Sequence, residues 1–271
     1  MKNILTLSLL TFREALSKKI FLFFFSVSTF IIVVFALLFA FISPESFSDG
    51  FVSSQTTSFD NSIANGIKIF LIYPLYAGGL FISIFSVSSF IPSLLEKGNI
   101  DLILSKPVSR EQVILGKFFG GIAMVFTNIF YAIFFLWLLI GLKFNVWDAS
   151  FLLSSFTITL AFTSIYSVII LLGIITRSSM LPMVISYLIF FVFSPILAAR
   201  DSIFAFVDNE IIRGIFSLFY YLVPQTSDLS TINTDLAVGN YISSFIPILT
   251  SIAYIILIIS LSIFIFRKKD Y

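Results

Sequence analysis

The chain has 271 residues, of which 59% are hydrophobic and only 11% charged, and its formal net charge is +2. Such a composition is far more apolar than that of a soluble domain and indicates a protein that crosses the membrane several times. The chain contains neither Cys nor His. This excludes disulfides, thiolate and imidazole metal sites, and Cys or His nucleophile chemistry. We therefore expect no catalytic residue, no bound cofactor and no metal in this chain.

Residues 1–19 have the pattern of an amphipathic helix, because apolar side chains recur at helical spacing while the basic residues fall mostly elsewhere on the wheel. The apolar residues of this pattern are Leu5, Leu9, Phe12 and Leu16. The pattern predicts an N-terminal interfacial helix on the membrane surface. Residues 20–42 follow without a charge, and this run is long enough for a first membrane span.

Five more apolar runs are long enough to span a membrane. They are residues 68–95, 113–142, 151–175, 180–199 and 241–266. Between the last two, residues 200–240 contain apolar stretches interrupted by charges, so we expect an extracytoplasmic helical loop. In it, 203–223 form interfacial or re-entrant helices and 225–240 a polar loop. The sequence thus predicts an all-α polytopic membrane protein with six transmembrane helices and an outer-face helical insertion before the last span.

The basic residues indicate the orientation. With six spans both termini lie on one side, and this side receives 12 of the 16 Lys and Arg residues. Basic residues concentrate on the cytoplasmic side of membrane proteins. We therefore expect both termini in the cytoplasm and the protein in the cytoplasmic (inner) membrane. A nucleic-acid partner is not indicated, because these charges serve as topology signals.

Residues 96–112 form a polar segment between two apolar runs, on the side expected to be cytoplasmic. Gly98 ends the preceding helix, and residues 99–105 have the pattern of a short helix that stops before Lys106-Pro107. Ser109 and Gln112 have the spacing of a capping box that would start the third span. The residues alone leave two interpretations open, a docking helix for a cytoplasmic partner or a solvated connector.

Two stretches resemble a known family. The run from Glu96 to Gly120 reads E-x-G-x-I-x-L-I-L-S-K-P-x-S-R and then I-L-G-K-F-x-G, and it resembles the coupling region of ABC exporter permeases of the type 2 family. The stretch TFREALSKKIF at 11–21 resembles the opening of the branch named for multicopper-enzyme maturation. One departure is Asn99-Ile100, where that family more often has Thr and Leu.

The resemblance implies a single permease domain over residues 1–271, which dimerises with an identical or a different permease and docks two cytoplasmic ABC ATPase subunits. It leaves room for an extracytoplasmic accessory protein. ATP and Mg would belong to the ATPase, and membrane lipid surrounds the permease. Carried over position by position, the ATPase-coupling residues are Glu96, Gly98, Ile100, Asp101, Leu102, Leu104, Ser105, Lys106, Pro107, Ser109 and Arg110.

Other features bear on function. No phosphate-binding G-x-x-x-x-G-K-[ST] motif is present, so ATP hydrolysis is expected in another chain. No ionisable residue lies near the middle of an expected span, which argues against an ion-coupled carrier. Gly116 and Gly120 form a G-x-x-x-G that permits close helix approach, within the chain or at a dimer seam. Asn128 and the hydroxyls of the fourth span line a substrate path or simply bond to backbone.

Two other classes of function are weighed against the exporter. A secondary carrier or channel would work without an ATPase partner and would use residues 96–112 as a mere loop. A lipid-modifying enzyme would need clustered catalytic groups. The pairs Glu96 with Asp101 and Asp208 with Glu210 are the dense acidic candidates, and they fall on opposite sides of the membrane.

Overall fold

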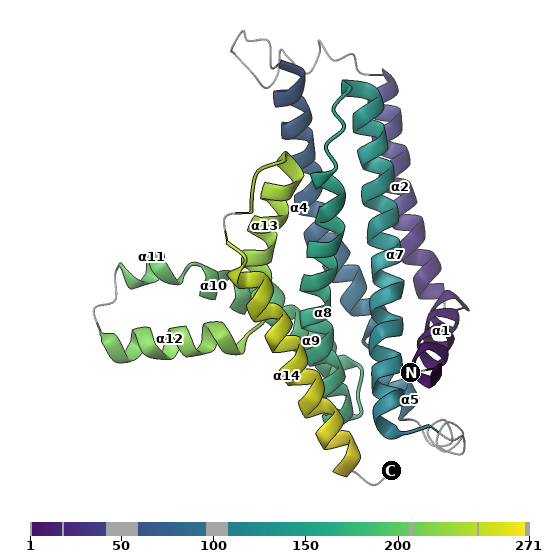
Figure 1. Ribbon diagram of the computed structural model, residues 1–271, viewed down its shortest axis with the longest axis vertical. Coiled ribbons are helices and arrows are strands. Elements are labelled where there is room, and N and C mark those ends of the chain that lie inside the picture. The colour runs from purple at the N-terminus through teal and green to yellow at the C-terminus, as the bar shows by residue number, and fades with distance from the viewer. Residues whose placement is uncertain are drawn as a thin grey trace.

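The computed structural model describes residues 2–17, 19–41, 59–95, 108–205, 209–242 and 244–268. Within these ranges the regular elements are all helical, as expected (Figure 1). They are α1 (Lys2–Ser17), α2 (Lys19–Phe41), α4 (Phe59–Val87), α5 (Phe90–Leu94), α7 (Arg110–Phe144), α8 (Ser150–Thr176), α9 (Met180–Leu188), the π-helical turn η1 (Ile189–Phe193), α10 (Ser194–Ala198), α11 (Arg200–Phe204), α12 (Glu210–Leu222), α13 (Thr226–Val238) and α14 (Ile246–Lys268).

Six helical segments in the described ranges are long and apolar enough to cross a membrane, which confirms a multi-pass fold. They are Phe21–Phe41, Ala64–Leu94, Arg110–Phe144, Ser150–Thr176, Met180–Ala198 and Ile246–Lys268. The segments form an elongated bundle, and both termini lie at the same end of it (Figure 1). This end is called the termini end below, and the opposite end the far end.

The core of the bundle is α8. In its most apolar stretch 78% of the residues are buried, against 22–39% in the other five segments. α8 is surrounded by α4, α7, α9, α13 and α14. Its side chains are apolar or carry hydroxyl groups, as expected of a helix with neighbours on every face.

The second span differs from the expected uninterrupted run over 68–95. α4 already begins at Phe59, ends at Val87 and is followed by a turn at Ser88–Ser89 and then by α5. Pro92 has no N–H to donate to the carbonyl of Ser88, which explains the break. Toward the far end, α4 extends beyond the expected start at Lys68, whose buried side chain forms an ion pair with Asp148.

The expected polar loop at 225–240 is wrong, because most of it forms helix α13. The apolar side chains of Leu229, Ile232 and Leu236 are buried, and α13 packs on α8 and α4. Gly239, with a φ of +84°, ends the helix in the left-handed conformation that glycine adopts freely. The last helix, α14, begins at Ile246 and not at 241.

α11 and α12 project sideways from the bundle (Figure 1), and we call residues 200–222, except 206–208, the arm. The arm joins the bundle near Tyr220, whose ring lies 3.7 Å below the guanidinium carbon of Arg200. The Tyr220 hydroxyl donates a 3.0 Å hydrogen bond to Asp228 of α13. Burial raises the pKa of the Asp228 carboxyl, and the bond from Tyr220 opposes this rise.

Candidate coupling site

Nine of the eleven expected coupling residues lie outside the described residues. They are Glu96, Gly98, Ile100, Asp101, Leu102, Leu104, Ser105, Lys106 and Pro107. The short helix expected at 99–105 lies outside them too. Ser109 and Arg110 are described, and they stand at the start of α7. The description of the site therefore rests on the two elements that flank residues 96–107, which are α5 and the start of α7.

The chain enters this segment from α5, which is anchored on α8. Phe90, Ile91 and Leu94 are buried. Ile91 contacts the backbone of Gly173 in α8 so closely that a Cβ added to this glycine would lie 3.3 Å from the Ile91 Cβ. The entry point is therefore fixed to the central helix of the bundle.

The chain leaves the segment through the first turn of α7, where the capping box expected from the sequence is present. The Ser109 hydroxyl accepts a 3.3 Å hydrogen bond from the Gln112 backbone N–H. In return, the Gln112 side-chain oxygen accepts a 3.2 Å bond from the Ser109 N–H. Both bonds satisfy N–H groups that a helix start leaves without partners. The start of α7 is thus defined to the residue.

The same turn contacts the end of α14. Arg110 Nη1 lies 3.4 Å from the carbonyl oxygen of Phe266 and 3.5 Å from that of Arg267. These carbonyls belong to the last turn of a helix, where a cation is favourable. Arg267 in turn lies 3.1 Å from Glu111, but both side chains are largely exposed, so this ion pair contributes at most about 1 kcal/mol. The start of α7 is therefore in contact with the last turn of α14.

α1 is seated on the next two turns of α7 through glycines. A Cβ on Gly116 would lie 2.5 Å from the Leu7 Cβ, and one on Gly120 would lie 2.6 Å from the Thr11 Cβ. Only glycine allows the two helices to approach this closely. The G-x-x-x-G pair is used here for packing within the chain.

An ion pair reinforces this seat. Lys117 is only 8% exposed, and its Nζ lies 2.6 Å from Glu14 Oε2 of α1. On the opposite side, the Tyr166 hydroxyl of α8 donates a 3.0 Å bond to the Lys117 carbonyl oxygen. The partner of Lys117 was missed from the sequence. A signal was present, because a lone cation in an apolar helix needs a counter-charge when it is buried, but the distance along the chain hides which one.

Deeper in the bundle, Asn128 of α7 accepts a 2.7 Å hydrogen bond from Ser28 of α2, while its Nδ2 has no partner among the described residues. The hydroxyls of α8 mostly bond to carbonyls of their own helix, as those of Thr159 and Thr163 do at 2.7 Å. This use is the commoner one for such residues. In the described ranges no three His, Cys, Asp or Glu residues cluster as metal ligands.

Comparison with known proteins identifies the family. The family model described as ABC-2 family transporter protein matches residues 6–271. A comparison with curated proteins finds no match. The family match covers nearly the whole chain and agrees with the six apolar segments. The chain therefore belongs to the ABC-2 transporter family, as a multi-pass permease component of an ABC transporter.

Proposed function

We propose that the chain is the permease subunit of an ATP-driven exporter and that residues 96–107 dock a separate cytoplasmic ABC ATPase. The observation that carries this proposal is the anchoring of the segment at both ends. α5 is fixed on α8, and the start of α7 is tied to α14 and α1. A force applied to the segment therefore reaches α5 and α7 directly, and through them α8, α14 and α1.

The geometry supports a simple sequence of motion. ATP binding closes two ATPases, each docked on one copy in a dimer of permeases, and their closure displaces residues 96–107. α7 then moves together with α1, because the glycine seat and the Glu14–Lys117 ion pair join them. α4 moves relative to α5 at the Ser88–Ser89 turn. ATP and Mg stay in the ATPase, and this chain supplies only motion.

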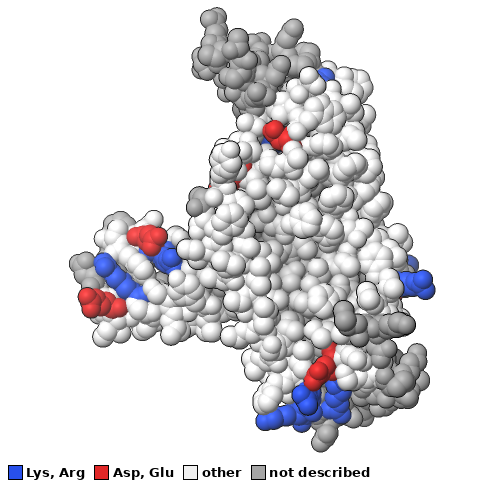
Figure 2. Space-filling model, in the orientation of Figure 1, with Lys and Arg blue, Asp and Glu red and all other residues white. Residues whose placement is uncertain are grey.

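The charge distribution supports an orientation with the termini end in the cytoplasm. Figure 2 shows Lys and Arg gathered at this end and on the arm, with a largely uncharged surface between them. The excess of basic residues marks the cytoplasmic side. Figure 1 shows the arm projecting from the bundle at about the height of α1, away from the far end. Its charged residues, Glu210 and Arg213 among them, would each cost about 2.5–3.5 kcal/mol at the centre of a membrane-spanning helix.

A mutation in the docking segment tests the proposal. The chain is co-expressed with its ABC ATPase, and the ATPase that co-purifies is measured together with transport in vesicles. Leu104→Asp should lose the ATPase, because removing a buried apolar anchor costs about 2 kcal/mol or more. Arg110→Ala, at the rim, should reduce binding only mildly. Pro107→Ala should weaken coupling without loss of binding, because it loosens the turn that directs α7.

Membrane insertion of each variant serves as the control. If Leu104→Asp inserts normally and retains ATPase binding and transport at native levels, the docking assignment is wrong.

A further inference from the structure

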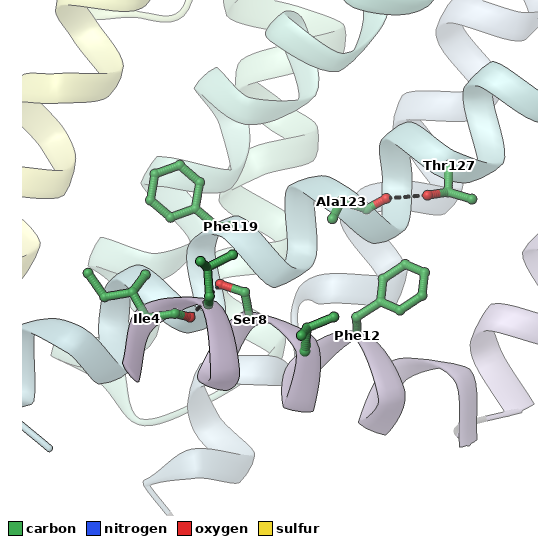
Figure 3. A pocket seen from close by; sticks show the side chains of 8 residues that line it. Ile4, Ser8, Phe12, Phe119, Ala123 and Thr127 are labelled. Carbon is green, nitrogen blue, oxygen red and sulfur yellow. Dashed lines mark hydrogen bonds between the residues drawn. The ribbon is translucent and has the colours of Figure 1, made fainter. Parts of the chain in front are cut away.

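A groove lies between α1 and α7 (Figure 3) and encloses about 720 Å³. This volume is in the range of sites for small molecules, roughly 300–1,000 Å³. Its apolar lining consists of Ile4, Leu5, Leu9 and Phe12 from α1 and Phe119 and Ala123 from α7. The α7 residues belong to a segment that is long and apolar enough to span a membrane.

The two polar residues in the lining do not make it polar. The Ser8 hydroxyl donates a 2.9 Å hydrogen bond to the Ile4 carbonyl, and the Thr127 hydroxyl donates a 2.7 Å bond to the Ala123 carbonyl. Both hydroxyl protons are therefore used within their own helices. Leu5 remains 64% exposed and Phe119 50%. The groove thus presents uncovered apolar side chains that a hydrocarbon chain would cover.

Positive charge lies beside this apolar surface. Arg13 is exposed and follows Leu9 by one helical turn, so it lies on the same flank of α1. Lys19, the first residue of α2, is exposed as well. The one acidic side chain of α1, Glu14, is neutralised by Lys117. Figure 2 shows basic side chains on the edge of the molecule at the height that α1 has in Figure 1.

We propose that this groove binds an acyl chain of an anionic phospholipid whose phosphate contacts Arg13 and Lys19. The proposal rests on the orientation given under the proposed function. In that orientation α1 lies at the cytoplasmic leaflet, where basic residues attract anionic lipids. A bound acyl chain would fill the angle between α1 and α7 just beyond the glycine seat. The lipid would therefore stabilise the unit that transmits motion from the docking segment.

The test uses the purified full-length chain in nanodiscs without ATPase or nucleotide. The discs contain a small fraction of phosphatidylglycerol or of phosphatidylcholine, each with the same photoactivatable acyl chain. Labelled peptides are quantified by mass spectrometry. Phosphatidylglycerol should label the groove residues of α1 and α7 more strongly than phosphatidylcholine.

Three variants separate the contributions to binding. In Arg13→Gln/Lys19→Gln, labelling by phosphatidylglycerol should fall toward the phosphatidylcholine level, by about fivefold per charge. Ala123→Trp should block both lipids, because the side chain of Ala123 faces the groove. Arg213→Gln, a charge change on the arm, is the matched control and should leave labelling unchanged.

Equal labelling of the groove by both lipids in the native chain would overturn the proposal, since it is the behaviour of unspecific surrounding lipid. Unchanged labelling in the double charge variant, or α1 cross-linked to a second copy in place of lipid, would also overturn it. The charge variant alters only exposed side chains, so the test stands even if Ala123→Trp fails to fold. Because no ATPase is present, loss of ATPase docking would leave this labelling intact, and the two proposals fail separately.

Discussion

Gly120 marks a point of very close approach between α1 and α7, and even one added methyl group should push the two helices apart. A Cβ at this position would lie 2.6 Å from the Thr11 Cβ and 2.8 Å from the Ser8 carbonyl oxygen. The Ser8 carbonyl is backbone and cannot rotate away, so α1 has to shift as a whole. Overpacking of this kind costs about 1–3 kcal/mol. The population with α1 detached should therefore rise by about 5- to 150-fold.

The absence of cysteine from the chain allows a direct assay. Ala15 of α1 is only 2% exposed, so Ala15→Cys should react with a water-soluble maleimide only when α1 detaches. Gly120→Ala in the Ala15→Cys protein should raise the rate of the maleimide reaction by about 5- to 150-fold. The matched control is Gly66→Ala, because a Cβ there meets no described atom within 4 Å. Both substitutions favour helix by about 0.5–1 kcal/mol. The difference between the reaction rates of the two variants therefore reports the clash at Gly120. An unchanged rate in Gly120→Ala would refute the assignment of the seat.

Further predictions concern charge and activity. Glu14→Gln should lower the free energy of unfolding by about 1–3 kcal/mol, because it leaves the buried ammonium of Lys117 without its partner. Adding Lys117→Met should restore stability, and equal unfolding temperatures for the single and double variants would contradict this. The pKa of Asp228 is raised by burial, so its contribution to stability is complete below the ordinary value of about 4 and is lost as pH rises through the raised one. Asp228→Asn should remove this pH dependence of the unfolding temperature, and an identical slope in both proteins would rule the explanation out. Arg267→Ala should change stability by less than about 1 kcal/mol, which thermal unfolding can check. Reconstituted alone, the chain should neither hydrolyse ATP nor move a substrate against its gradient, and either activity would point to a carrier or enzyme.

Features with a local cause could be predicted from the sequence. The six apolar runs follow from the length that hydrocarbon demands of a helix. The capping box needs only Ser109 and Gln112 three residues apart. Such signals lie within one turn or one span, so no knowledge of distant contacts is required.

α13 shows why other features were missed. Its Ser, Thr, Asp and Asn residues are poor helix formers, and they led to the expectation of a loop. Leu229, Ile232 and Leu236 nevertheless have the spacing of one helix face, and Gly239 stands where a helix would end. Burial of this face against α8 and α4 outweighs the weak local preference. The packing of α1 on α7 was missed for another reason. No residue near Gly116 or Gly120 indicates which helix packs against these glycines.

The pairing of α1 with α7 has a consequence for biosynthesis. Glu14 and Lys117 are 103 positions apart, so α1 leaves the ribosome long before its seat exists. At about 5–20 residues per second, α1 waits roughly 5–20 s for α7 to be made. During this time the membrane surface is the available place for its apolar residues. Leu5 and Leu9, which stay exposed in the folded chain, can hold α1 at the bilayer throughout the wait, so that it docks by moving along the membrane and not from solution.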